Sequence, residues 1–146
     1  MHFNFIAENK VKLSLFTADP PLLNVLHGDA GSRPRLAELA EIFKSKCLVC
    51  AKRSKSRDWF DLYTLIRDHH FTLEDVEEAF TEAQIPEQLD GALARLCSGK
   101  RSTHDEGYAH LTQEAPSLES IARFFRQQRD EYEIRTAAQK GSKRPE

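Results

Sequence analysis

The charged residues between positions 46 and 61 have the types and spacing that phosphate chemistry requires. Three cations and two carboxylates gather around one predicted helix start: Lys46, Arg53, Arg57, Asp58 and Asp61. Lysine and arginine form strong, charge-assisted hydrogen bonds with phosphate oxygens, and carboxylates can orient a site or transfer protons. Large apolar residues flank the cluster. This pattern predicts a site for a phosphorylated, metal-bound ligand.

A purely structural interpretation of the same residues also exists. Arg57 and Asp61 are four residues apart, so an exposed ion pair worth about 0.3–0.5 kcal/mol would explain part of the pattern. Lys46, however, falls three residues after Phe43 and four before Cys50, close to the apolar side of its helix. Its stem is expected to be partly buried, with the ammonium directed at a partner. Both interpretations stay open on the residues alone.

A cysteine pair lies within the span of the cluster, and a histidine pair follows it. Cys47 and Cys50 have the C-x-x-C spacing of zinc and redox sites, but zinc needs four ligands and the nearest others, His69 and His70, follow the next predicted helix. We therefore predict two buried thiols and no metal site. The histidines are expected to interact with the carbonyl groups at a helix end.

The cluster must be positioned by helices, because apolar residues around it recur at steps of three and four. Leu39, Phe43 and Cys47 belong to the buried face of a first helix that runs from about 36 to about 53. The same spacing, with helix-capping residues, predicts further helices over about 58–66, 72–83, 86–97 and 117–132. The acidic residues between 74 and 90 indicate a solvated acidic helix face.

Upstream of these helices the pattern changes. Alternating residues predict an N-terminal β-hairpin over 2–16, and the prolines and glycines of 17–35 predict an irregular loop. The predicted helical region covers 36–135, and 136–146 is expected to be a flexible tail. The predicted fold class is therefore α+β: one mainly helical domain of 1–135 in which a β-hairpin precedes about five helices.

Composition limits the classes of protein to consider. The chain has 146 residues, 40% of them hydrophobic and 30% charged, with a net charge of −2, which is typical of one globular domain. No apolar run approaches the roughly 20 residues that span a bilayer, and the N-terminus has no signal-peptide pattern. Three cysteines, an odd number, favour a reducing compartment. We predict a cytoplasmic protein that does not interact with membranes.

Residues 11–66 resemble the C-terminal half of the AbiEii/AbiGii-type toxin nucleotidyltransferases. The resemblance rests on the strand VKLSLF with its PPLL loop, on the helix around KCLVC, and on R-x-K-x-R-D followed by D-L-Y. Positions of the family's motifs correspond to Lys46, Arg53, Arg57, Asp58 and Asp61 of this chain. The helices after residue 66 are compatible with the family but carry no motif.

The resemblance implies transfer of a nucleotidyl group from a nucleoside triphosphate, with Mg²⁺, in toxin–antitoxin or abortive-infection phage defence. Lys46, Arg53 and Arg57 would bind the nucleotide, and Lys46, Asp58 and Asp61 would be catalytic. Lys46 and Arg53 would offset triphosphate charge, and either carboxylate would orient the site or transfer a proton. Implied partners are an antitoxin and an RNA acceptor.

The sequence also departs from the family. Such enzymes have an upstream Gly-rich turn and an Asp-x-Asp strand for two magnesium ions, whereas the nearest segment here, 27–34, offers the single Asp29. We therefore expect a truncated protein that is inactive alone. Two alternatives are half of a split enzyme, with a complementary N-terminal half pairing to the hairpin edge, and a helical interaction module of a toxin–antitoxin pair that uses the acidic face.

Overall fold

The computed structural model describes residues 2–7, 11–27 and 35–142. Its two strands are β1 (His2–Ala7) and β2 (Val11–Phe16), which pair antiparallel with His2 opposite Phe16. The α-helices are α1 (Pro20–Val25), α2 (Leu39–Lys52), α3 (Ser56–His69), α4 (Leu73–Glu82), α5 (Leu89–Ser98) and α6 (Leu118–Ser142). Two short 3-10 helices, η1 (Pro86–Gln88) and η2 (Ala109–Leu111), lie in the connections. None of the described helices is long and apolar enough to cross a membrane.

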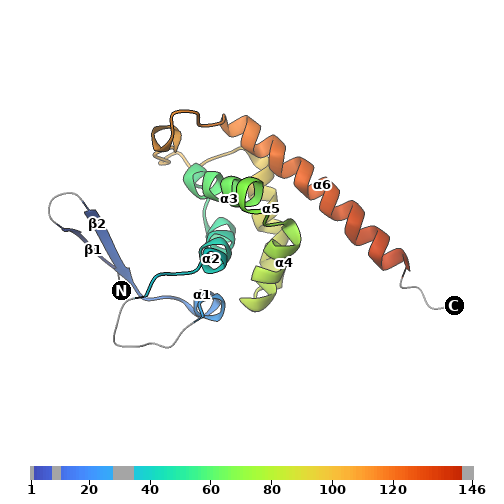
Figure 1. The fold of residues 1–146 in the computed structure, drawn as a ribbon, viewed down its shortest axis with the longest axis horizontal. Coiled ribbons are helices and arrows are strands. Elements are labelled where there is room, and N and C mark those ends of the chain that lie inside the picture. The colour runs from blue at the N-terminus through green and yellow to red at the C-terminus, as the bar shows by residue number, and fades with distance from the viewer. Residues whose placement is uncertain (1, 8–10, 28–34, 143–146) are drawn as a thin grey trace.

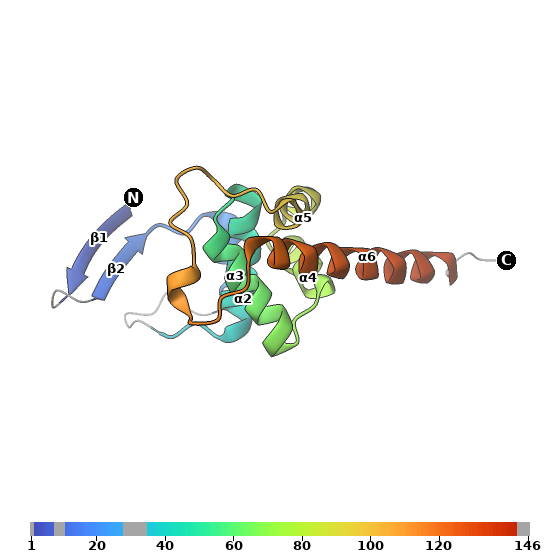
Figure 2. The ribbon, with the colours of Figure 1, turned by 90° about the horizontal axis from the view of Figure 1, so that it is seen from above.

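The predicted α+β class is wrong, because the folded body is built from helices. Among the described side chains, every buried apolar residue lies between Val25 and Phe125, on a helix or in a connection that follows one. In the described part of the chain, β1 and β2 pair only with each other and no helix packs extensively on them. Figure 1 shows this pair of strands beside the helices, and Figure 2 shows the same from above. An alternating sequence pattern therefore gave no information about whether a sheet forms a layer of the core; two strands alone rarely do.

The predicted loop 17–35 contains a helix, which is a second correction. Asp19 accepts a hydrogen bond from the backbone N–H of Leu22 at 3.1 Å, and Pro20 and Pro21 occupy the first two positions of α1. Proline is compatible with a first helical turn, whose N–H groups have no partner within the helix. Val25 at the end of α1 is completely buried. Residues 28–34, including Asp29, lie outside the described residues.

The core forms where α2 packs against α3, α4 and α5 and where α6 crosses α3, α4 and α5. Its largest completely buried side chains are Trp59, Phe43, Phe80 and Phe125. α2 begins at Leu39 rather than near 36, and Leu36 is 93% exposed. Thr72 and Asp75 exchange hydrogen bonds and form a capping box at the start of α4.

The last helix is longer than expected. α6 continues to Ser142, past residue 135 where the helical region was predicted to end, and the tail residues 143–146 lie outside the described residues. Ile121, Ala122 and Phe125 in its first half are buried. Its second half extends beyond the other helices in Figures 1 and 2. α6 therefore contributes to the core through its N-terminal half.

Candidate functional site

Four of the five predicted site residues meet between α2 and α3. α2 carries Lys46 and ends at Lys52, and Arg53 follows it directly. α3 begins at Ser56 and carries Asp58 and Asp61 in its first two turns. Because the connection is short and both helices bury apolar faces, the end of α2 lies next to the start of α3. The structure thus brings together residues that the sequence places up to fifteen positions apart.

Asp58 is the centre of the cluster. It is 2% exposed, and its carboxylate accepts hydrogen bonds from Arg53 Nε at 2.8 Å and Arg53 Nη2 at 3.2 Å. Lys46 Nζ donates to the same carboxylate at 3.2 Å. A buried carboxylate needs such partners, and its place in the first turn of α3 also favours negative charge. Asp58 is therefore suited to hold two cations in place.

Lys46 connects the two carboxylates. Its Nζ lies 2.6 Å from Asp61 Oδ2, and its side chain is 27% exposed. Burial alone would lower the pKa of the Lys46 ammonium, but the ion pairs with Asp61 and Asp58 outweigh burial and raise it. The hydrogen bond to Asp58 likewise raises the pKa of Arg53. Both side chains are cations at neutral pH, so Lys46 cannot act as a base.

Arg57 lies apart from this network. The ion pair between Arg57 and Asp61 that a structural interpretation required does not form, since Asp61 binds Lys46 instead. Within the described residues, no carboxylate forms an ion pair with the exposed Arg57. Arg57 lines a cavity of about 200 Å³ together with Arg53, Lys55, Asp58 and residues 105–107. We call this space the basic cavity; it lies at the N-terminus of α3, where the helix dipole favours anions.

A loop distant in sequence closes the basic cavity, and the sequence interpretation assigned it no role. Asp105 Oδ2 accepts a hydrogen bond from the backbone N–H of Ser56 at 2.9 Å, and the N–H of Ser102 donates to the carbonyl of Ser54 at 2.8 Å. Burial would raise the pKa of Asp105, but hydrogen bonds with Ser56 and Gly107 lower it. Gly107 has a φ of 76°, which favours glycine at this turn. Lys55, the lysine of the R-x-K-x-R-D motif, also lines this cavity, although the sequence interpretation assigned it no role.

The described residues do not fit a Mg²⁺ site at the cluster. Both oxygens of Asp58 face Lys46 or Arg53, and Asp61 shares Lys46, so a divalent cation would have to displace these side chains. Across the described part of the chain, no group of three His, Cys, Asp or Glu side chains is arranged to hold a metal ion.

The predicted burial of both thiols is confirmed, since Cys47 and Cys50 are free and 1% and 0% exposed. Burial raises the pKa of both thiols, so neither is a reactive thiolate. The exposed His69 ends α3, and His70 follows it with a left-handed backbone, φ 61°. Neither pair belongs to the cluster.

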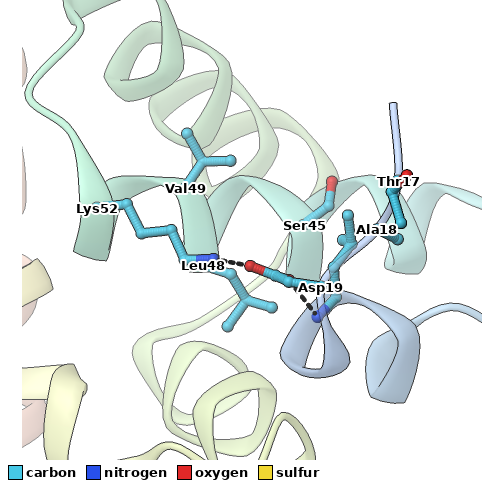
Figure 3. Close-up of a pocket in the computed structure, with 8 residues that line it drawn as sticks. Thr17, Ala18, Asp19, Ser45, Leu48, Val49 and Lys52 are labelled. Carbon is cyan, nitrogen blue, oxygen red and sulfur yellow. Dashed lines mark hydrogen bonds and ion pairs between the residues drawn. The ribbon is translucent and has the colours of Figure 1, made fainter. Parts of the chain in front are cut away.

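A separate, smaller cavity lies where the N-terminal segment crosses α2. Figure 3 shows Asp19 between α1 and α2, where it both caps α1 and pairs with Lys52. The cavity has about 150 Å³ and is lined largely by apolar groups, Leu22, Leu48 and Val49 among them. Among the described residues that line this cavity, only Asp19 and Lys52 are charged, and they are already paired with each other. We therefore assign the cavity a structural role, in which it holds the N-terminal segment on α2, and no chemical activity.

The acidic face of α4 is used within the molecule. Glu74 accepts hydrogen bonds from Arg135 of α6 at 2.8 and 3.0 Å, and Glu77 accepts one from the Tyr132 hydroxyl at 2.8 Å. Glu82 pairs with Lys44 of α2. These contacts leave fewer free carboxylates for a basic partner than the charge pattern suggested.

Comparison with known families identifies the family of this chain. The chain matches the model of the nucleotidyl transferase AbiEii toxin, type IV toxin–antitoxin system, over residues 7–140, which places it among nucleotidyltransferase toxins. It belongs to the AbiEii family. The match extends well beyond residues 11–66 and also covers α4, α5 and most of α6. No curated protein and no solved structure matches the chain.

Proposed function

We propose that this chain takes part in nucleotidyl transfer and that the basic cavity binds the phosphates of the nucleoside triphosphate. The observation that carries the proposal is the gathering of Arg53, Lys55 and Arg57 around one cavity at the N-terminus of α3. The same cavity is also lined by three carboxylates, Asp58, Asp105 and Glu106. Asp58 is paired with Arg53, and Asp105 accepts a hydrogen bond from the Ser56 N–H. Lys55, Arg57 and the helix N-terminus therefore remain to attract a polyphosphate. Family membership supplies the reaction class.

Within this proposal the five motif residues have different roles. Arg57 binds phosphate directly, because it is exposed and forms no ion pair with the other described residues. Lys46 and Arg53 offset charge that develops on the phosphates. The buried Asp58 positions both cations, and the part-exposed Asp61 orients the acceptor or takes its proton.

We further propose that the chain needs a complementary polypeptide for activity. Asp58 and Asp61 are committed to Lys46 and Arg53, so ligands for Mg²⁺ have to come from elsewhere. The Gly-rich turn and the Asp-x-Asp strand implied by the resemblance would supply them. An antitoxin is a partner that fits a type IV system, and RNA is the acceptor to be tested first.

The test is a transfer assay with the full chain, Mg²⁺ and labelled nucleoside triphosphates, with RNA or protein as acceptor. We expect label only when a polypeptide with the Gly-rich and Asp-x-Asp motifs is added, and at least a tenfold loss with Arg57→Ala. Arg123→Ala, which changes an exposed arginine of α6, is the matched control.

The two proposals can be contradicted separately. Labelling by the chain alone would show that no complementary polypeptide is needed. An Arg57→Ala variant as active as Arg123→Ala, or no labelling in any combination, would reject the role of the basic cavity in nucleotidyl transfer.

A further inference from the structure

We infer that a second cavity on α3 binds the base and ribose of the same nucleoside triphosphate; this inference rests on the proposed function. The cavity has about 350 Å³ and is lined by Ile42, Lys46, Phe60, Asp61, Thr64 and Leu65. We call it the apolar cavity. Ligand sites of this size typically combine apolar walls with a few polar groups, which is the chemistry that a flat base with hydrogen-bonding edges requires.

The two cavities follow one another along α3. Arg57, Asp61 and Thr64 are spaced by four and three residues, so they lie on one side of the helix. Arg57 lines the basic cavity, and Asp61 and Thr64 line the apolar one. Arg57 and Thr64 are separated by about 10 Å along the axis. The base and the terminal phosphates of an extended nucleoside triphosphate are a comparable distance apart.

The ion-pair network forms a wall shared by both cavities. Asp58 lines the basic cavity, Asp61 lines the apolar cavity, and Lys46 Nζ binds Asp58 at 3.2 Å and Asp61 at 2.6 Å. The loop that closes the basic cavity also supports the apolar one. Tyr108, directly after Gly107, stacks on Phe60 with ring centroids 5.0 Å apart.

The apolar cavity offers a ligand polar groups in addition to its apolar walls. Asp61 uses Oδ2 to bind Lys46, and Oδ1 forms no ion pair with the described residues. The hydroxyl of Thr64 is buried and has no hydrogen-bond partner. An unpaired buried hydroxyl is costly, so rotation of the Thr64 side chain toward the cavity would let it bond a base or ribose hydroxyl. The part-exposed Asp61 can accept a hydrogen bond from the same ligand. Ile42 is 40% exposed at the rim, where a bound base would cover it.

The test compares the binding of nucleoside triphosphates, unphosphorylated nucleosides and inorganic tripolyphosphate to the full chain by calorimetry. Ile42→Gln removes apolar surface from the rim without adding charge. We expect it to weaken nucleoside triphosphate binding roughly fivefold to tenfold and to leave tripolyphosphate binding unchanged. Thr64→Val should weaken only ligands that carry a nucleoside, by a smaller factor. Ile134→Gln, at an isoleucine of α6 that is 69% exposed, is the matched control.

The outcomes separate this inference from the proposed function. If Arg57→Ala weakens tripolyphosphate but Ile42→Gln behaves like Ile134→Gln for every ligand, the apolar cavity does not bind the nucleoside and the basic cavity still binds phosphate. If tripolyphosphate does not bind, the proposed phosphate site is rejected. If nucleosides still bind in that case and Ile42→Gln weakens their binding, the proposal that the apolar cavity binds the base and ribose is still supported.

Discussion

The charged side chains at the α2–α3 junction differ in burial, and burial decides what each contributes. Asp58 is almost completely enclosed and holds two cations, whereas Asp61 is about one-third exposed and shares one of them. Exposed ion pairs contribute little to stability, but loss of one member of a buried network leaves charges without a partner. Structural and functional roles can therefore be separated residue by residue.

Asp58→Asn is expected to lower the free energy of unfolding by about 2 kcal/mol, because Lys46 and Arg53 then meet across an uncharged amide. Asp61→Asn should cost less than about 1 kcal/mol, since water reaches this carboxylate. Urea unfolding of both variants and the wild type measures the difference. Equal losses would contradict the assignment of Asp58 as the residue that positions both cations.

Glu41 provides a pH-dependent contact at the start of α2. It is 1% exposed and accepts hydrogen bonds from Arg35 and from the backbone N–H groups of Glu38 and His27. These contacts, the Arg35 hydrogen bond foremost, lower the pKa of Glu41 to about 2. A carboxylate with a lowered pKa stabilises the fold above its unfolded pKa of about 4.3 and loses that contribution as pH falls through the folded value.

The stability difference between wild type and Glu41→Gln should therefore be constant above about pH 5 and should shrink as the pH falls toward 2. Chemical unfolding at several pH values measures it. Glu38→Gln, next to the same helix start, serves as control. A difference that stays the same down to pH 2 would show that Glu41 does not titrate as a bound carboxylate.

At the scale of elements, the helices around the site were predicted well and their surroundings were not. The spacing of apolar residues placed α2 and α3, because a buried helical face leaves a periodic trace in the sequence. α1 was missed because Pro20 and Pro21 were interpreted as helix breakers, although they begin the helix that Asp19 caps. The contact of Asp105 with Ser56 joins residues 49 positions apart and leaves no local trace.

The two halves of α6 should differ in local stability. Ile121, Ala122 and Phe125 are buried, whereas the last turns, from Arg135 onward, are held mainly by surface contacts such as the exposed pair of Arg135 with Glu74. Segments with few buried contacts open at low free energy. Hydrogen exchange should therefore be faster for amides of 136–142 than for those of 121–129, and Glu74→Gln should accelerate the former only. Uniform protection along α6 would contradict this expectation.

For the whole molecule, the arrangement separates a helical body from the pair of strands. The core elements between Val25 and Phe125 contact each other through several pairs of helices, while β1 and β2 chiefly contact each other. Such an antiparallel pair has strand edges that another polypeptide can extend. In the proposed two-part enzyme, the strands would join the complementary polypeptide and the helical body would bind the nucleotide.

Removal of residues 1–16 should therefore leave the helical body folded, with a midpoint of thermal unfolding within a few degrees of the full chain. Removal of 1–26 should lower the midpoint clearly, because it also deletes α1 and the completely buried Val25. The shorter deletion should retain tripolyphosphate binding and lose activation by the complementary polypeptide. If it unfolds the body, the strands are part of the core; if it keeps full activation, they do not join the two polypeptides.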